Sequence, residues 1–168
     1  MKIYTKTGDR GRTGTFYGRM GKGDQLAEAL GAIDELNSWV GTCRENSRFK
    51  IQDSVIEKEL KRIQTNLLTI GSGLAGSGLK LRYQEIKNLE NKIDKWTRDL
   101  PKLANFVYPV GELQVARSVC RRAERRVVAL GIKEKNTLKY LNRLSDALFV
   151  MGRWINHKLK IPEEVWRG

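Results

Sequence analysis

The sequence predicts an all-α protein in which five helices form a bundle behind a glycine- and threonine-rich N-terminal arm. Three observations lead to this fold class: apolar residues recur at helical spacing in five segments, glycine or proline stands between those segments, and no segment is clearly typical of a β-strand. The length of 168 residues suits one domain. We therefore expect a single domain over 1–168, with the arm at 1–24 and the helical bundle at 25–160.

The arm differs in composition from everything that follows it. Its 24 residues include six glycines, interspersed with threonines and basic side chains, and this density of glycine disfavours a helix. We expect a loop that is ordered by itself or by a ligand. Free backbone N–H groups, threonine hydroxyls and the cations Lys6, Arg10 and Arg12 have the chemistry of a phosphate cradle. The arm has no Walker A motif and follows no strand, so a flexible basic tail explains it at least as well when it is taken alone.

The first two helices follow from apolar periodicity. Asp24 is placed to cap a helix, and the apolar spacing after it predicts a helix over 25–45. Ser54 and Glu57 have the spacing of a capping box at the start of the second helix, which the glycine-rich stretch at 71–78 ends. The apolar stripe of this second helix has the spacing of a bundle seam and consists of Leu60, Ile63, Leu67, Ile70 and Leu74.

Glycine and proline mark the ends of the other three helices. The bounds that we expect for them are 82–99, 111–130 and 135–159. A residue that ends a helix lies just beyond each of them, namely Pro101, Gly131 and Pro162. Between the third and fourth helices, the segment at 105–112 is expected to form a loop around Pro109.

Composition excludes several classes of protein. No apolar run approaches the roughly 18 residues of a membrane-spanning helix, and the first residues lack the apolar core of a signal peptide. Two cysteines and one histidine make a disulfide framework, a structural zinc site or a Ser-His-Asp triad poor interpretations. Cys120 is expected to be a buried thiol and His157 a surface residue. We expect a cytoplasmic protein that does not contact a membrane.

The net charge is the unusual feature of the composition. The chain has 32 lysines and arginines against 19 acidic residues, so its formal charge is +13 and its pI is near 10.0. Such a surface attracts polyanions. Nucleic acid and a phosphate-rich small molecule are both candidates, and composition does not choose between them.

Arginine is concentrated in the fourth predicted helix. Arg117, Arg121 and Arg125 are four residues apart and share one face, while Arg122 and Arg126 lie about 100° around the helix axis. These five cations repel one another unless an anion neutralises them, and the guanidinium group binds phosphate bidentately. A solvated basic face is the alternative. Apolar residues between the arginines require one side of the helix to be buried, which brings the arginines towards other elements. The nearby carboxylates that could pair with them are Asp34, Glu35 and Asp146.

Six parts of the sequence form a combination that is far more specific than any short motif. They are KIYTKTGDRGRTGTFYG (2–18), Lys22, EALGAIDELNSWVG (28–41), FVYPVG (106–111), ARSVCRRAERRVVAL (116–130) and YLNRLSDALFVMGR (140–153). In this order they resemble the ATP:cob(I)alamin adenosyltransferases of the trimeric, five-helix type. The middle helices, over 46–100, are similar to that family only in character.

The resemblance implies a reaction and an assembly. Reduced cobalamin, Co(I), attacks C5′ of ATP, so that adenosylcobalamin forms and inorganic triphosphate leaves. Arginine, lysine, backbone N–H groups and Mg²⁺ on the phosphates stabilise a leaving group of this charge, and no acid–base residue is needed because the cobalt is the nucleophile. The resemblance also implies a homotrimer with active sites between adjacent subunits. It implies as partners a cobalamin reductase and an adenosylcobalamin-dependent enzyme.

The resemblance assigns roles to individual residues. ATP is expected to contact Thr5, Lys6, Thr7, Gly8, Thr13, Gly14, Lys22, Arg121, Arg122, Glu124, Arg125 and Asn142. Arg121 is the residue expected to stabilise the triphosphate in the transition state, and any Mg²⁺ would lie near Glu124. Asp34 is expected to pair with Arg117 across the subunit interface. Phe106 matches the aromatic residue that displaces the lower ligand of the corrin and favours four-coordinate cobalt.

The sequence departs from the family's pattern at Val110, at Gln114 and at Met151 and Gly152, which concern the corrin side of the site rather than ATP. Two alternative functions stay open at this stage. One is a basic helical module that binds nucleic acid, which leaves the clustering of the arm motif with the arginine helix unexplained. The other is a sensor or chaperone that binds ATP or adenosylcobalamin with little turnover.

Overall fold

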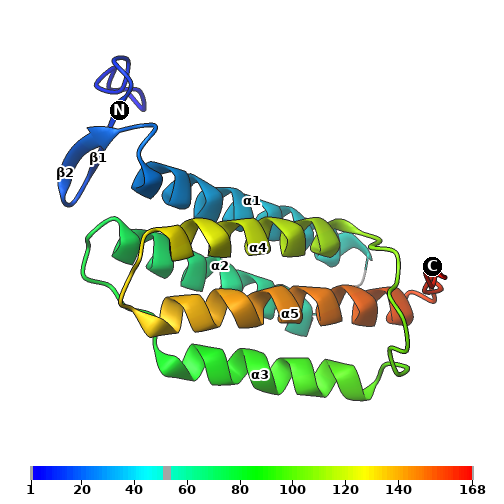
Figure 1. The fold of residues 1–168 in the computed structure, drawn as a ribbon. Helices are drawn as coiled ribbons and strands as arrows, with labels where there is room; N and C mark the ends of the chain where they lie inside the picture. Colours follow the sequence, from blue (N-terminus) through cyan, green and yellow to red (C-terminus); the bar gives the residue numbers. More distant parts are fainter. Residues whose placement is uncertain (1, 51–53, 168) are drawn as a thin grey trace.

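The protein is a helical bundle that a small β-hairpin precedes (Figure 1). This computed structural model describes residues 2–50 and 54–167. The helices in these ranges are α1 Gln25–Lys50, α2 Ser54–Leu74, α3 Tyr83–Arg98, α4 Glu112–Ala129 and α5 Lys135–Lys158. The five-helix, all-α fold class is therefore confirmed. Within the same ranges, no helix has both the length and the hydropathy to cross a membrane.

The helices pack in a fixed order around one core. α4 lies between α1 and α5, α3 packs on the far side of α5, and α2 packs against α1 (Figure 1). The stripe predicted for α2 faces this core, with Leu74 only partly buried. The large, fully buried apolar side chains of α2 and α5 include Leu60, Ile63, Leu67, Leu141, Leu144, Leu148 and Met151. Helical period alone was sufficient to identify these residues.

One helix continues further than the sequence predicts, and another ends inside the glycine-rich stretch that was expected to end it. α1 does not end at 45 but at Lys50. α2 continues through Gly71 and Gly73 to Leu74. Glycine is used here for close approach rather than to end the helix, because a Cβ on Gly73 would overlap the carbonyl oxygen of Leu79 in the returning loop.

The two predicted N-terminal caps have different outcomes. The carbonyl of Asp24 accepts the N–H of Glu28 at 3.1 Å, so Asp24 does stand at the start of α1. Its carboxylate, however, accepts the N–H of Gly21 at 2.9 Å and so fixes the turn that leads into the helix. Ser54 is already the first residue of α2, and the residue before it lies outside the described ranges.

The expectation that the arm contains no strand is wrong. β1 (Arg12–Thr15) and β2 (Gly18–Gly21) form an antiparallel hairpin in which Arg12 pairs with Gly21 and Thr15 with Gly18. Gly18 follows the two-residue loop with a φ of 113°, which favours glycine. Four-residue strands made of glycine, threonine and charged residues have no apolar alternation, which explains why the sequence pattern did not reveal them.

A buried polar cluster connects three of the helices. Glu85 of α3 is 6% exposed, and its Oε2 accepts the Nε of Arg62 at 2.7 Å and the Nδ2 of Asn66 at 3.1 Å. The Nδ2 of Asn66 also donates to the hydroxyl of Tyr140 on α5 at 3.1 Å. Burial raises the pKa of Glu85, but the hydrogen bonds and charges of its partners outweigh this effect and lower the pKa below its usual value. Glu85 is therefore held as a carboxylate inside the bundle.

We expect Glu85→Gln to lower the free energy of unfolding by about 1–3 kcal/mol near neutral pH, because its partners lose a charged acceptor. The folded-state pKa of Glu85 is depressed. Its stabilising contribution is therefore complete above the unfolded pKa of about 4.3, and is lost as the pH falls through the folded-state pKa. Urea unfolding of both proteins should show a difference that shrinks on acidification. Leu68→Ala, an exposed change on α2, is the control; a difference independent of pH would contradict the assignment.

Candidate functional site

The arm begins with a tight loop that exposes hydroxyl and backbone groups. The Oγ1 atoms of Thr5 and Thr7 lie 2.8 Å apart, and Lys6 between them has a φ of 59°. Arg19 of β2 donates to the carbonyl oxygen of Thr7 and so connects this loop to the hairpin. Three predicted ATP-binding residues therefore lie together, with their side chains exposed to solvent.

The remaining predicted residues of the arm lie around the hairpin. A Cβ on Gly8 would be 3.3 Å from the Nζ of Lys22, so the ammonium group lies close over the Gly8 backbone. The N–H of Lys22 donates to the carbonyl of Gly11 at 2.8 Å, which fixes the chain as it leaves β2. Thr13 and Gly14 are on β1. The hairpin thus brings Gly8 and Lys22 together, although they are far apart in the sequence.

Two of the five arginines of α4 are paired with carboxylates of α1. Arg122 donates to Glu35, and Arg126 lies 3.4 Å from Glu28. Glu35 was one of the partners expected from the sequence, and Glu28 was missed, although it lies about two helical turns earlier on the same face of α1. Within the described residues, neither Asp34 nor Asp146 forms an ion pair. The α1 side of the arginine cluster is therefore neutralised inside the chain.

Arg121 and Arg125 differ from these paired arginines. Both are exposed, and no carboxylate in the described part of the chain lies within ion-pair distance of either. Between them along α4, Oε1 of Glu124 accepts the Nδ2 of Asn142 on α5 at 3.3 Å. Five predicted site residues of α4 and α5 therefore form one surface, on which two guanidinium groups are free to bind an anion.

A hollow of about 390 Å³ lies between the arm and the paired arginines of α4. It lies between the end of the arm, α1 and α4, and its charged lining residues are Lys22, Glu28, Glu35, Arg122 and Arg126. Lys22 and Arg122 are both predicted to contact ATP. The structure therefore places Lys22 of the arm and Arg122 of α4 around a common space within a single chain.

The two cysteines do not contribute a nucleophile. Burial raises the pKa of the Cys120 thiol, and the charge of Glu124 adds to this effect; its Sγ lies 3.3 Å from the carbonyl oxygen of Leu141. Burial also raises the pKa of Cys43 to about 12, helped by the charge of Glu112. Both thiols are thus protonated near neutral pH, and the expectation that Cys120 is a core residue is confirmed.

The loop that carries Phe106 is held by the C-terminal segment, which sequence reasoning missed. Val107 forms an antiparallel bridge with Val165. Two backbone hydrogen bonds of 2.9 Å flank this bridge: the N–H of Trp166 donates to the carbonyl of Phe106, and the N–H of Tyr108 donates to the carbonyl of Glu164. The rings of Phe106 and Trp166 meet edge to face, with centroids 6.3 Å apart. Phe106 is nevertheless 78% exposed. Its ring is thus held at the surface, where a ligand can contact it.

A buried arginine anchors this C-terminal segment. Arg153 on α5 is 6% exposed, and its guanidinium donates to Glu163 at 2.9 Å and to the carbonyl of Pro101 at 3.1 Å. Glu163 immediately precedes the residues that pair with the Phe106 loop. The only signal in the sequence was a β-branched and an aromatic residue near the end of the chain, which is too short a pattern to predict a bridge.

Gln114 and Gly152, two positions at which the sequence departs from the family's pattern, form one cluster with Arg117. The Nε of Arg117 donates to the Oε1 of the buried Gln114 at 3.0 Å, and its guanidinium carbon lies 5.7 Å from the centroid of the Phe149 ring. A Cβ on Gly152 would be 2.9 Å from the Nε2 of Gln114, so the glycine leaves space for the glutamine. Arg117 is therefore oriented within its own chain. The expected pair between Asp34 and Arg117 joins two subunits, and it stays a prediction.

The predicted residues lie at two ends of the molecule. Figure 1 shows the hairpin at one end of the bundle, whereas the loop before α4 and the C-terminus lie at the other. Phe106 is therefore not brought to the arm of its own chain. α4 connects the two regions, with Arg121 and Arg125 in its second half.

The chain is similar in sequence to one protein family and to several of its members. The family model described as cobalamin adenosyltransferase matches residues 3–155. The corrinoid adenosyltransferase MMAB of Bos taurus is 42% identical over 185 residues, which cover 99% of this chain and 76% of the relative. The corrinoid adenosyltransferase of Bacillus subtilis (strain 168) is 40% identical over 175 residues, which cover 97% of this chain and 91% of the relative.

Solved structures show the same fold. A variant of the PduO-type ATP:corrinoid adenosyltransferase from Lactobacillus reuteri, complexed with cobalamin and ATP, matches with a TM-score of 0.90 and 36% identity, over 99% of this chain and 100% of that one. Another variant of the same enzyme, complexed with ATP, has a TM-score of 0.89 and 36% identity, over 98% and 100%. The family model, the relatives and these structures together show that the chain belongs to the cobalamin adenosyltransferase family.

Proposed function

We propose that this protein transfers the 5′-deoxyadenosyl group of ATP to the Co(I) of reduced cobalamin, giving adenosylcobalamin and triphosphate. The observation that carries the proposal is the pair of exposed arginines, Arg121 and Arg125, which form no ion pair within 2–50 and 54–167, beside neighbours that α1 neutralises. Family membership adds the substrates, since related structures contain ATP and cobalamin. A chain that neutralises some arginines and leaves others free has a defined place for a polyanion.

The chemistry needs charge stabilisation more than proton transfer. Co(I) supplies the electron pair of the new bond between cobalt and C5′, and the bond between C5′ and O5′ breaks with its electrons on the triphosphate. Guanidinium groups that are already in place stabilise that developing charge without reorganising. Arg121, in the middle of the free face, is the residue that we assign to this role, with Lys22 and Arg122 near the phosphates.

Mg²⁺ fits the same surface as a companion of the phosphates. In the described ranges, no three His, Cys, Asp or Glu side chains are grouped to hold a metal ion by themselves. Mg²⁺ commonly takes one or two carboxylates together with substrate phosphates, and Glu124, beside Asn142, offers one carboxylate. Bound there, the ion would neutralise part of the triphosphate charge.

The complete site is expected to need more than one copy of the chain. The arm and Phe106 lie at opposite ends of the bundle, so one chain alone does not bring its ATP-binding arm to its own corrin-side aromatic (Figure 1). A homotrimer with sites between adjacent subunits would combine the two ends. The expected contact of Asp34 with Arg117 belongs to this assembly, and both residues are accessible to a neighbour because Asp34 is exposed and Arg117 is half-buried.

The corrin side of the proposed site is the exposed ring of Phe106. An aromatic side chain against the lower face of the corrin excludes water and displaces the lower ligand, which makes Co(II) easier to reduce to Co(I). The C-terminal segment holds the loop of this ring through Trp166 and Val165. The reductase that supplies Co(I), the enzyme that receives the product and a cytoplasmic location stay predictions from the sequence.

Arg121→Ala should lower kcat/KM by about 10²–10³-fold, the usual effect of removing one donor that stabilises transition-state charge. The assay is anaerobic, with ATP, Mg²⁺ and chemically reduced cobalamin, and follows the loss of the Co(I) absorbance and the formation of a light-sensitive product. Arg98→Ala, which removes an exposed arginine of α3, is the matched control and should leave turnover unchanged. Wild-type activity in Arg121→Ala would refute the assigned role.

Phe106→Ala should reduce turnover much more than it reduces ATP affinity, because the exposed ring is assigned to the corrin and not to the nucleotide. ATP affinity is measured by calorimetry without corrinoid, and turnover by the same absorbance assay. Leu103→Ala changes another exposed apolar residue of the preceding loop and serves as the control. Equal losses of affinity and turnover would argue against the corrin assignment.

The two alternatives make different predictions for the wild-type protein. A sensor or chaperone would bind ATP and adenosylcobalamin but form little product in the absorbance assay. A nucleic-acid-binding module would bind duplexes with an affinity that falls steeply with salt, since each phosphate contact releases counterions. Substantial turnover, together with weak duplex binding, is the outcome that supports the transferase.

A further inference from the structure

The hairpin of the arm has little support from the bundle. Among the described elements, β1 and β2 pack extensively with each other and not along any helix. The chain joins them to α1 through the turn at Asp24, whose carboxylate accepts the N–H of Gly21. One attachment of this kind leaves the hairpin free to swing as a unit about the turn. A second point of contact is needed to give it one orientation.

That second contact is made by the tip of the hairpin and the loop after α2. The N–H of Phe16 donates to the carbonyl oxygen of Ala75 at 2.9 Å. Beside it, the ring of Tyr17 lies against Gly76, so closely that a Cβ there would be 2.8 Å from Cζ, 2.9 Å from Cε2 and 3.0 Å from Cε1. Gly76 also has a φ of 98°, in the region that favours glycine. The loop therefore offers the ring a bare backbone surface that no other residue could supply.

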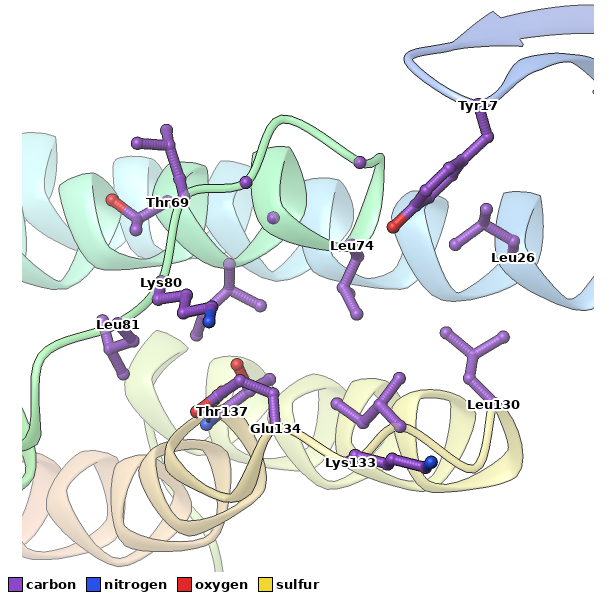
Figure 2. Close-up of a pocket in the computed structure, with 16 residues that line it drawn as sticks. Tyr17, Leu26, Thr69, Leu74, Lys80, Leu81, Leu130, Lys133, Glu134 and Thr137 are labelled. Carbon is purple, nitrogen blue, oxygen red and sulfur yellow. Dashed lines mark hydrogen bonds between the residues drawn. The ribbon is translucent and has the colours of Figure 1, made fainter.

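The other sides of the Tyr17 ring are open. Figure 2 shows the ring directed into a hollow at the end of the bundle, with Leu26, Leu74 and Leu130 further inside. This hollow has a volume of about 510 Å³, and Tyr17 is 74% exposed. Gly76 is thus the close contact that defines where the ring lies. Replacing this single contact should change the position of the hairpin without disturbing the core.

We propose that Tyr17 and Gly76 form an anchor that positions the arm for ATP, and that Tyr17 is a positioning residue of the reaction. The inference rests on the proposed function, because it takes the arm to be the ATP-binding segment. Tyr17 lies at the turn between β1, which carries Thr13 and Gly14, and β2, which leads to Lys22. Fixing the turn at one end and Asp24 at the other sets the direction in which these groups face α4.

The anchor is expected to act on ATP binding more than on the chemical step. Without the anchor, the arm samples many orientations, and only some of them can bind ATP. The apparent affinity for ATP then falls in proportion to the fraction of molecules whose arm has a binding-competent orientation. Once ATP is bound, the arm is ordered and Arg121 is unchanged. Loss of the anchor should therefore raise KM for ATP about tenfold or more, while kcat at saturating ATP changes less than threefold.

Gly76→Ala and Gly78→Ala form a matched pair for the test. Both glycines are in the same loop with positive φ, 98° and 80°, so both variants introduce similar backbone strain. A Cβ at 78 meets no atom within 4 Å, whereas one at 76 meets the Tyr17 ring. KM for ATP should rise in Gly76→Ala and stay close to wild type in Gly78→Ala. Equal values in the two variants would overturn the proposal.

A second pair of variants keeps the backbone of the loop unchanged. Tyr17→Ala removes the ring and should raise KM for ATP as Gly76→Ala does, whereas Tyr17→Phe keeps the ring and should restore the wild-type value. Tyr17 is on the surface, so neither change threatens the core. If Tyr17→Phe is as impaired as Tyr17→Ala, the contact of the ring with Gly76 is not the cause and the proposal fails.

Hydrogen exchange without ATP separates this inference from the proposed function. The backbone amides that form the hydrogen bonds of the hairpin, within residues 12–21, should exchange faster in Gly76→Ala and in Tyr17→Ala than in the wild type. In Gly78→Ala and in Tyr17→Phe they should exchange at the wild-type rate. Faster exchange with an unchanged KM for ATP would overturn the positioning role. Failure of the wild type to bind ATP or form product would reject the proposed function instead. Unchanged exchange in all variants would show that no anchor exists.

Discussion

The buried face of α4 is the constraint on which the arrangement of the site depends. After Leu113, its buried apolar residues recur at helical spacing and are small or β-branched: Ala116, Val119, Cys120, Ala123 and Val127. They pack between α1 and α5, and this packing fixes the rotation of the helix about its axis. One flank then meets the carboxylates of α1, while Arg121 and Arg125 are directed to solvent. A rigid helix in a close-packed core therefore determines which cations are neutralised and which are available.

The segments that flank this helix are built differently. The arm and the loop of Phe106 have few apolar contacts, and each is held by a small number of backbone hydrogen bonds to a distant segment. Elements of this kind open more easily than the helices, and ligand-binding segments are commonly drawn from such regions. The protein thus combines fixed charges on α4 with two adjustable segments, one at each end. The buried carboxylate of Glu85, with Asn66 and Tyr140, helps to hold α2, α3 and α5 together.

The sequence predicted most of the helical part of the fold and the location of the arginine surface. Apolar period identifies helices because a buried stripe must repeat with the helical turn. The hairpin and the bridge of Val165 were missed, since pairs of such short strands depend on backbone hydrogen bonds that side-chain patterns do not encode. The end of α1 was wrong, because no glycine or proline stands between 45 and Lys50 to mark it. The pairing of Arg126 with Glu28 depends on the crossing of two helices, which one sequence does not specify.

The contact between Gln114 and Gly152 couples a residue of α5 to the orientation of a cation on α4. Gly152 lies where a Cβ would be 2.9 Å from the amide nitrogen of Gln114, and the other end of that amide holds Arg117. A larger side chain at position 152 would require the amide to shift in a close-packed interior. Because the amide is the end of a flexible side chain, that shift would turn the guanidinium of Arg117 rather than separate the helices. The identity of a residue on α5 therefore helps to set the direction of a cation on α4.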